Sequence, residues 1–589
     1  MTSDITLATY LFNRIKQLGV EHILGVPGDF NLMLLDYIYE VPPLKWVGFC
    51  NELNAAYAAD GYGRFKQTPG VLITTYGVGE LSALNGISGA RAESVPLLHI
   101  VGTTGRAIQE EHLLIHHVPP GDGLEEPDHT LYMQTSKPLA CAHEFLYDPK
   151  KVLDQIDHVI TQVAKQSKPG YLYIPVDMVH KKVPSDRLNT PLDLKVVNSG
   201  QQDLEDKVVQ QVLDAIYQSR DPVIIADTLA ERHHAVELVK ELVEKTKFLS
   251  FNTSMGKGIV DENHPSYVGV YNGKASGKGI AETVEGSDLR IHIGPLFSDS
   301  NTGGFTHETK PETSIQLHPL YCSVKGHQYD HLHFYPVLEK IVKQLDVSKI
   351  PQNATPKPPR APIEQEENAG SADGITQTYF TEFMNRFMRP NDSLLVESGT
   401  FQFACQDIYM KENSSFVTQI FYSSIGFTFP ALVGSCVARR EQNHPGRCIL
   451  VEGDGSAQMT IQELGTMIRY KLNPTIFLLN NDGYSIERAI WGPQQGYNDI
   501  CPNWKWTQLC ESLGGTPGKD CASFKVSTKK QLDDLLISKE FESHSDKLRL
   551  VEVVLDAFDY PWRLRAQVQR MGKFNRDKFE AYAKNAGEV

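Results

Sequence analysis

The sequence predicts an α/β fold made of doubly wound parallel sheets, in which helices cover both faces of each sheet. Two observations lead to this prediction. Short apolar runs alternate with helical stretches along the 589 residues. Many of these runs end in Gly, Asp or Asn, as buried parallel strands do before they turn into a helix. The clearest runs are His22–Val26, Val71–Thr75, Leu97–Val101, Leu172–Pro175, Pro222–Ala226, Arg290–Ile293, Cys448–Val451, Thr475–Leu479 and Leu550–Leu555.

Two polar breaks divide these elements into three blocks. The chain becomes polar, with scattered prolines, around 183–200, and 350–374 joins a proline-rich stretch to an acidic one. A segment so poor in apolar residues cannot bury a core and is typical of a linker. We therefore predict domains at 1–185, 200–348 and 375–589, with a linker at 349–374.

The charge balance and the cysteines exclude several classes of protein. With 57 basic and 72 acidic residues the net charge is −15, which argues against binding nucleic acid. The nine cysteines are odd in number and form no CxxC pair, so at least one thiol is free and a reducing compartment is favoured. No secretory signal is evident, and no apolar run approaches the ~18 residues of a membrane span. We expect a cytoplasmic protein that binds neither nucleic acid nor membrane.

The strongest chemical signal lies in the third block, where two polar clusters follow two apolar runs. Gly453-Asp454-Gly455-Ser456 follows one run, and 480–487 follows the next, with Asp454 and Asn481 separated by 27 positions. Either cluster alone is more often an ordinary turn. At this spacing both belong to one βαβ unit, so they can face each other at the carboxyl ends of its strands.

These two clusters offer a set of oxygen ligands. The Asp454 carboxylate, the Asn481 amide oxygen and a backbone carbonyl near Gly483 suit Mg²⁺ that holds a diphosphate. Glycines let the backbone approach phosphates, and Ser456 is expected to open a helix whose N-terminus favours anions. The sequence therefore predicts a site for a diphosphate and a magnesium ion.

Several segments of the first block accompany the two clusters of the third block in one known family. They are Val26–Phe30, Asn51–Tyr62, Gly77–Ala83 and the pair His116-His117. Together with the third block they resemble the pyruvate decarboxylase family of thiamine-diphosphate-dependent 2-oxo-acid decarboxylases, in particular its fungal members. The resemblance extends over essentially the whole chain. It implies the three-domain fold of thiamine-diphosphate enzymes, the cofactors thiamine diphosphate and Mg²⁺, and non-oxidative decarboxylation of a 2-oxo acid to an aldehyde and CO₂.

The resemblance also implies roles for individual residues. Glu52 matches the glutamate that protonates the pyrimidine ring, so that the cofactor's own amino group can remove the thiazolium proton. Asp29, His116, His117 and Glu487 match the acids and histidines that act on the substrate carboxylate and on the enamine. Ile425 matches the wedge under the bent cofactor, and the Ser423 carbonyl would accept its amino group, although Ser423 stands where Gly is common. The expected cofactor residues are Glu52, Thr400, Ser423, Ile425, Asp454, Gly455, Ser456, Asn481, Gly483, Tyr484, Ser485 and Ile486, with Asp454, Asn481 and Gly483 on the metal.

The preferred 2-oxo acid is left open. The expected substrate pocket is formed by Ser300, Gln402, Ile486 and Ile490. Ser300 stands where some members have a bulky aromatic residue, which opens volume and makes a larger branched, aromatic or polar 2-oxo acid an alternative to pyruvate. Alternatively, neighbouring side chains fill the space. Leu229 lies where some fungal members have a cysteine, so we expect weak or absent cysteine-based substrate activation.

Two other functions stay open beside decarboxylation. One is carboligation of the acetolactate synthase type, against which the His116-His117 pair argues. The other is a non-catalytic thiamine-diphosphate sensor or regulatory homologue, although Glu52, His116 and Glu487 are all present. The resemblance implies a homodimer or homotetramer with the active site at the subunit interface, because the first and third blocks that bind one cofactor come from different subunits.

Overall fold

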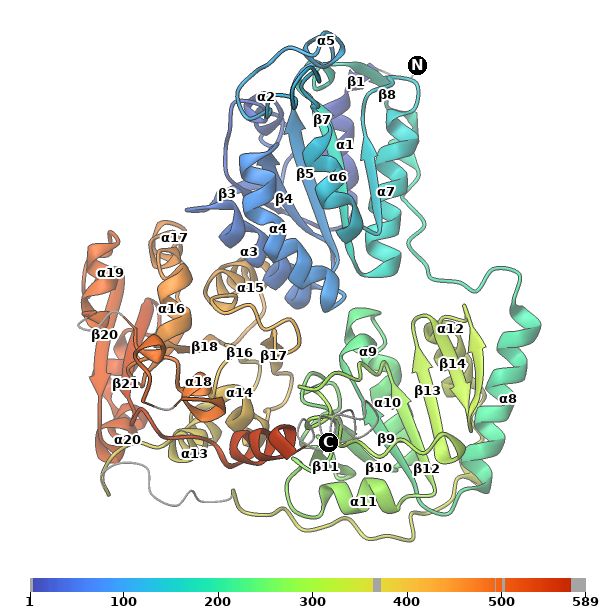
Figure 1. Cartoon of the computed structure of the whole chain (residues 1–589). Helices are drawn as coiled ribbons and strands as arrows, with labels where there is room; N and C mark the ends of the chain where they lie inside the picture. The colour runs from blue at the N-terminus through green and yellow to red at the C-terminus, as the bar shows by residue number, and fades with distance from the viewer. Residues whose placement is uncertain (1–3, 364–371, 493, 501–503, 574–589) are drawn as a thin grey trace, which may run out of the picture.

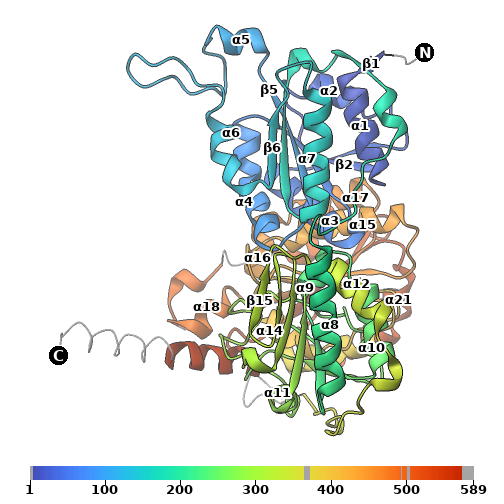
Figure 2. The ribbon, with the colours of Figure 1, turned by 90° about the vertical axis from the view of Figure 1, so that its right-hand side faces the viewer.

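The computed structural model describes all residues except 1–3, 364–371, 493, 501–503 and 574–589. Figure 1 shows three α/β units, each with a sheet between helices. Figure 2, turned by 90°, shows the N-terminal unit above the other two. None of the helices in the described part of the chain has the length and apolar character needed to cross a membrane. The second half of the predicted linker lies partly outside the described residues.

The first sheet contains six parallel strands in the order β3-β2-β4-β5-β7-β6. Its strands are β2 (His22–Gly25), β3 (Lys45–Gly48), β4 (Gly70–Thr75), β5 (Leu97–Thr103), β6 (Ala142–Phe145) and β7 (Pro169–Pro175). Its helices are α1 (Leu7–Gln17), α2 (Leu32–Asp36), α3 (Glu52–Lys66), α4 (Val78–Ala92), α5 (Arg106–Glu110), α6 (Leu131–Ser136) and α7 (Val152–Gln166). A small antiparallel pair, β1 (Asp4–Thr6) and β8 (Lys182–Pro184), joins the two ends of this unit.

The second sheet has seven strands in the order β11-β10-β9-β12-β13-β14-β15, of which the last two are antiparallel. Lys325 and Gly326 form the two-residue turn between β14 and β15, and both have positive φ, as a tight hairpin requires. The strands are β9 (Pro222–Ala226), β10 (Leu249–Asn252), β11 (Tyr267–Val270), β12 (Leu289–Ile293), β13 (Ser314–His318), β14 (Tyr321–Val324) and β15 (His327–Asp330). The helices are α8 (Gln202–Gln218), α9 (Thr228–Arg232), α10 (Val236–Thr246), α11 (Ile280–Gly286) and α12 (Phe334–Gln344).

The third sheet is again parallel, in the order β17-β16-β18-β19-β21-β20. Its strands are β16 (Ser393–Val396), β17 (Ser415–Thr418), β18 (Cys448–Gly453), β19 (Thr475–Asn480), β20 (Cys521–Val526) and β21 (Leu548–Val554). Its helices are α13 (Gln377–Phe387), α14 (Phe401–Ala404), α15 (Thr428–Glu441), α16 (Asp454–Thr460), α17 (Glu463–Arg469), α18 (Ser485–Ile490), α19 (Leu509–Ser512), α20 (Lys529–Ile537) and α21 (Lys539–Ser543). Every apolar run named above is a strand, and the predicted fold class is confirmed; the antiparallel hairpin of the second sheet was not predicted.

Helices α3 and α15 join the first and third units through a close crossing. A Cβ atom built on Gly434 would lie 2.8 Å from the Ala58 carbonyl carbon, and one on Gly61 would lie 2.6 Å from Ala431 Cα. Only glycine therefore fits at these two positions. The apolar core of the first unit is continuous with the core on one face of the third sheet, whereas the other face of that sheet and the second unit have cores of their own. Helix α3, whose first residue is Glu52, is thus fixed against the third unit.

Candidate active site

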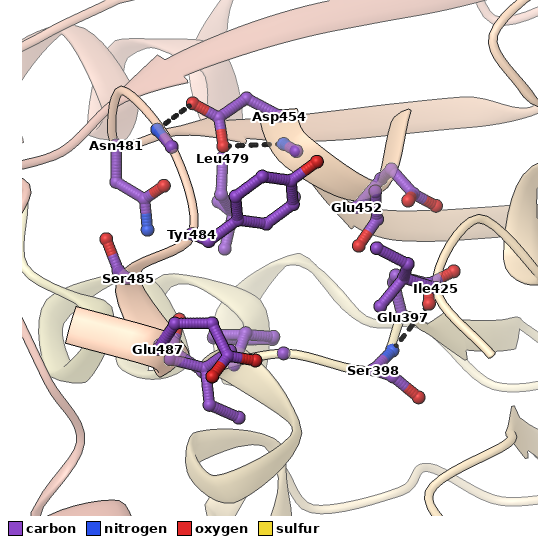
Figure 3. Close-up of a pocket in the computed structure, with 18 of the residues that line it drawn as sticks. Glu397, Ser398, Ile425, Glu452, Asp454, Leu479, Asn481, Tyr484, Ser485 and Glu487 are labelled. Carbon is purple, nitrogen blue, oxygen red and sulfur yellow. Dashed lines mark hydrogen bonds between the residues drawn. The ribbon is translucent and has the colours of Figure 1, made fainter. Parts of the chain in front are cut away.

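A pocket opens at the carboxyl ends of β16, β18 and β19, where the sequence predicted the diphosphate and magnesium site (Figure 3). Parallel sheets bind ligands at this edge. All of its lining residues in the described part of the chain belong to 397–487. Eleven of the predicted site residues line it: Thr400, Ile425, Asp454, Gly455, Ser456, Asn481, Gly483, Tyr484, Ser485, Ile486 and Glu487.

Three oxygen atoms face one another in this pocket. Asn481 places an amide atom 3.1 Å from Asp454 Oδ1 and 2.9 Å from the Gly483 carbonyl oxygen. If this atom is the Asn481 amide oxygen, the three acceptor oxygens repel one another unless a cation lies among them. If it is the amide nitrogen, it donates to Asp454 and to the Gly483 carbonyl. Asp454 also accepts from the amides of Gly455 and Gly483, at 2.8 and 3.0 Å. The donor set fits a hard divalent cation such as Mg²⁺.

Burial raises the pKa of Asp454 to about 7, and the backbone hydrogen bonds from Gly483 and Gly455 offset only part of this shift. A bound cation would favour the charged form of this carboxylate. Helix α16 begins at Asp454, two residues earlier than the sequence indicated, so Ser456 lies in its first turn. Because α16 follows β18 directly, Asp454 and Ser456 both lie at the pocket.

Two buried glutamates in the pocket were not predicted. Thr428 Oγ1 lies 2.5 Å from both Glu397 Oε2 and Glu452 Oε2. Burial raises the pKa of Glu397 to about 7, and burial followed by the charge of Glu397 raises that of Glu452 well above its usual value. A hydroxyl group donates only one proton, so one carboxyl must be protonated to donate to Thr428. The sequence feature that could have revealed the pair is an acidic residue at the carboxyl end of each of two neighbouring apolar runs.

A second cluster lies on the first unit. His116 Nε2 lies 2.6 Å from Asp29 Oδ2, and the rings of His116 and His117 are 4.8 Å apart. Tyr76 and Tyr132 hold this segment by donating to the carbonyls of His116 and His117. The structure thus brings Asp29, His116 and His117 together, as the family resemblance implied.

Glu52 occupies the first turn of α3, half-buried, after the N-cap residue Asn51. A Cβ atom built on Gly79 would lie 3.0 Å from Glu52 Oε1, so this glycine leaves room for the carboxyl group. Neither Glu52 nor the Asp29–histidine cluster lines the pocket of the third sheet. The predicted site residues of one chain therefore lie in two separate places, on the first unit and in the pocket of the third sheet.

The predicted substrate residues divide in the same way. Ile486 lines the pocket, whereas Ser300, Gln402 and Ile490 are not among its lining residues. Ser300 donates to the Asp299 carboxylate, and Ile490 is half-exposed at the end of α18. Gln402 is buried, and its Oε1 has no hydrogen-bond partner among the described residues. The roles of these residues stay predictions.

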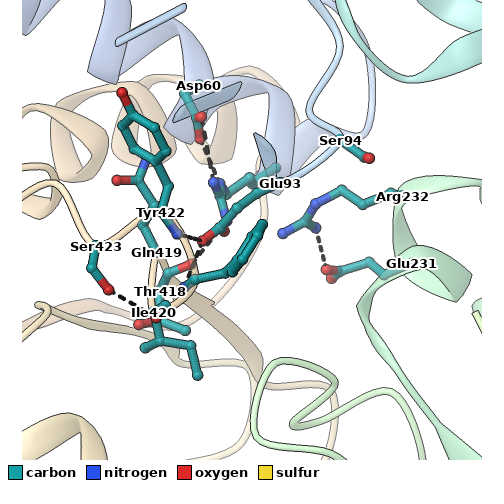
Figure 4. Close-up of polar contacts among 12 residues, drawn as sticks. Asp60, Glu93, Ser94, Glu231, Arg232, Thr418, Gln419, Ile420, Tyr422 and Ser423 are labelled. Carbon is teal, nitrogen blue, oxygen red and sulfur yellow. Dashed lines mark hydrogen bonds and ion pairs between the residues drawn. The ribbon is translucent and has the colours of Figure 1, made fainter. Parts of the chain in front are cut away.

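The loop that contains Ser423 and Ile425 is held by the first unit (Figure 4). Glu93 accepts from the amide of Tyr422 at 3.1 Å and from Arg64 Nη1 at 2.7 Å. Ser423 has a φ of 54°, the left-handed region that glycine adopts most easily. Serine therefore retains the backbone geometry of a glycine at this position, and Ile425 is exposed at the pocket.

The chain matches three family descriptions in order. Residues 5–126 match the N-terminal TPP binding domain of thiamine pyrophosphate enzymes, 209–345 their central domain, and 397–553 their C-terminal TPP binding domain. A solved structure, the Rhodococcus jostii RHA1 thiamine diphosphate-dependent 4-hydroxybenzoylformate decarboxylase, aligns with a TM-score of 0.73 at 19% identity. The alignment covers 94% of this chain and 99% of that one, and it confirms the fold. The chain is a thiamine pyrophosphate enzyme.

Curated proteins with similar sequences show to which family of thiamine pyrophosphate enzymes the chain belongs. The pyruvate decarboxylase of Kluyveromyces lactis is 39% identical over 570 residues, which are 96% of this chain and 98% of the relative. Pyruvate decarboxylase isozyme 3 of Saccharomyces cerevisiae is 38% identical, over 96% of this chain and 98% of its own. The transaminated amino acid decarboxylase of Saccharomyces cerevisiae is 36% identical, over 96% and 95%. The chain belongs to the pyruvate decarboxylase family, which confirms the prediction from the sequence.

Proposed function

We propose that this chain decarboxylates a 2-oxo acid to an aldehyde and CO₂, with thiamine diphosphate held through Mg²⁺. The observation on which the proposal rests is the meeting of Asp454, Asn481 and the Gly483 carbonyl in one pocket. When bound, thiamine diphosphate supplies the electron sink for the electron pair that the departing carboxylate leaves. The protein's part is to hold, orient and protonate.

The described side chains suit those tasks. Asp454, Asn481 and Gly483 would hold the metal, and Ile425 would support the cofactor from one side. Glu52 would keep a proton on the pyrimidine ring. His116 can share a proton with Asp29 over their 2.6 Å contact and deliver it to the product carbon. Glu487, exposed at the pocket, is the candidate group that faces the departing carboxylate.

We infer that two chains complete one site, as a homodimer or a pair of dimers in a homotetramer. The supporting observation is that Glu52 and the Asp29–histidine cluster lie on the first unit, away from the Asp454 pocket. The first unit of one chain would cover the pocket of its partner. Light scattering with and without thiamine diphosphate and Mg²⁺ tests this inference, and a fully active monomer would contradict it.

A 2-oxo acid larger than pyruvate is the second candidate substrate. The small Ser300 favours it, as does the buried Gln402 Oε1, which has no hydrogen-bond partner in the part of the chain that the structure describes. We expect Ser300→Phe to lower kcat/KM for phenylpyruvate relative to pyruvate by about tenfold or more, because pocket volume discriminates by about 1–3 kcal/mol. An unchanged ratio would place Ser300 outside the substrate pocket.

A substrate panel tests the reaction itself. Purified protein with thiamine diphosphate and Mg²⁺ is given pyruvate, 2-oxoisovalerate, 2-oxoisocaproate, phenylpyruvate and indolepyruvate, and aldehyde is measured by coupled reduction. Glu52→Gln should abolish most of the activity, whereas the exposed Glu40→Gln serves as the matched control. Acetolactate-type products would indicate a carboligase, and cofactor binding without product would indicate a sensor. The eight free cysteines of the described chain are consistent with the cytoplasm.

A further inference from the structure

A second cavity, of about 440 Å³, lies at the opposite edge of the third sheet. It opens at the amino ends of β18, β19 and β21, beside the C-terminal end of α15 (elements in Figure 1). Strand β18 runs from this cavity to the Asp454 pocket. The lining residues are Cys436, Arg439, Arg440, Asn443, His444, Gly446, Arg447, Cys448, Leu472, Asn473 and Ser545.

The cavity is positively charged within a chain of net charge −15. Three arginines and a histidine line it, and none of its described lining residues is acidic. Arg439 donates to Ser393 Oγ and to backbone carbonyls, and Arg440 donates to the carbonyls of Tyr470 and Lys471. These acceptors are neutral, and neither guanidinium forms an ion pair with a carboxylate of the described residues.

The third arginine of the cavity, Arg447, adds to its positive charge. Arg447 pairs with Asp392 at 2.5 Å, and its buried Nη1 has no hydrogen-bond partner among the described residues. Burial, and next the charge of Arg447, lower the pKa of Arg549 to about 10. An anionic group is the ligand that such a cavity favours.

Two thiols line the same cavity. Cys436 on α15 and Cys448 at the start of β18 are reduced, and they share a hydrogen bond. The hydrogen bond from Cys436 and the charge of Arg439 lower the pKa of Cys448 against burial and the charge of Asp392, whereas the pKa of Cys436 is raised. Thiolates are the reactive form of cysteine, and the arginines that line the cavity favour a thiolate at this pair.

We propose that Cys436 and Cys448 form a redox-active dithiol, which is oxidised by small anionic disulfides bound in the arginine-lined cavity. The Cys448 thiolate attacks one sulfur of the disulfide, and one anionic thiolate leaves. The Cys436 thiol then loses its proton to that thiolate or to water and attacks the Cys448 sulfur, and the second thiolate leaves. The balance is one protein disulfide and two small thiols from one protein dithiol and one small disulfide.

A second thiol pair provides an internal comparison. Cys510 on α19 and Cys521 at the start of β20 also share a hydrogen bond, and the pKa of Cys521 is lowered by it. The charged groups beside Cys521 are Asp520 and Glu511, which oppose this shift. Acidic surroundings repel an anionic disulfide. Burial of two adjacent cysteines as plain apolar side chains would predict no difference between the two pairs.

The test compares probes of opposite charge on the reduced full-length holoenzyme. Oxidised glutathione is the anionic disulfide and cystamine the cationic one, and peptide mass spectrometry follows each cysteine pair with time. We expect the Cys436–Cys448 disulfide to form about tenfold or more faster with oxidised glutathione than with cystamine at low salt, with the difference reduced at high salt. The Cys510–Cys521 pair should not show this preference.

Three variants locate the chemistry. Cys436→Ser should leave a stable mixed disulfide on Cys448, and Cys448→Ser should prevent rapid modification of Cys436. Arg440→Gln should slow the reaction with oxidised glutathione and leave the reaction with cystamine no slower. Equal rates for both probes at this pair, or no disulfide between the two cysteines in the wild type, would overturn the proposal.

Discussion

Replacing Gly434 by alanine tests the close crossing of α3 and α15. The added Cβ would lie 2.8 Å from both the carbonyl carbon of Ala58 and the backbone nitrogen of Tyr62. Ordinary carbon contacts measure about 3.5–4.0 Å, so the two helices must separate by roughly 1 Å. Such overpacking costs about 1–3 kcal/mol, and here both partners are backbone atoms that cannot rotate away.

The expected net effect is smaller because alanine favours the helix over glycine by about 1 kcal/mol. Taking the upper end of the overpacking cost, because backbone meets backbone, we expect Gly434→Ala to lower the free energy of unfolding of the joined first and third units by about 2 kcal/mol. The assay is urea unfolding, monitored through the hydrogen exchange of amides in the two helices. Gly286→Ala is the matched control, because a Cβ at this end of α11 meets no atom within 4 Å. If the amides of α3 and α15 exchange as slowly in Gly434→Ala as in the control variant, the two helices are not in backbone contact.

Further predictions concern the pocket and the buried polar groups. Asp454→Asn should weaken Mg²⁺ activation by at least tenfold, on the order seen even for outer-shell partners, whereas the exposed Asp546→Asn, outside the pocket, should leave the Mg²⁺ titration unchanged. Thr428→Val should destabilise the protein by about 1–3 kcal/mol in thermal unfolding, because it leaves two buried carboxyls without their shared hydroxyl, and Thr428→Ser should restore stability. Burial lowers the pKa of His99 to about 3. The neutral buried ring therefore stabilises the fold fully above the unfolded pKa near 6.5, and this contribution is lost as the pH falls toward 3, because only the unfolded state takes up the proton. The destabilisation by His99→Gln should therefore shrink by about 2 kcal/mol between pH 7 and pH 5, and a pH-independent difference would contradict this assignment.

The sequence predicted the strands of the parallel sheets because such strands are buried on both faces and appear as continuous apolar runs. The hairpin of β14 and β15 escaped prediction because its outer strand is mostly exposed: His327, Gln328 and Asp330 face solvent. Asp454 and Asn481 could be paired from spacing alone, since adjacent strands of one βαβ unit end side by side. Their meeting follows from topology.

The pairing of Glu397 with Glu452 could not be predicted in this way. It depends on Thr428, which reaches both carboxyls from a separate helix. Side-chain meetings of this kind are set by how α15 packs on the sheet, which local sequence does not encode. The same holds for the thiols of Cys436 and Cys448, which belong to no motif yet line one cavity.

The separation of Glu52 from the Asp454 pocket has a kinetic consequence under the proposed pairing of chains. A catalyst assembled from two copies loses its active site when the copies part, so its specific activity falls on dilution. At high dilution the rate would grow with the square of the chain concentration, and thiamine diphosphate, by bridging two copies, would shift the association equilibrium toward the working enzyme. The amount of cofactor would thereby set how many of the chains present are able to act.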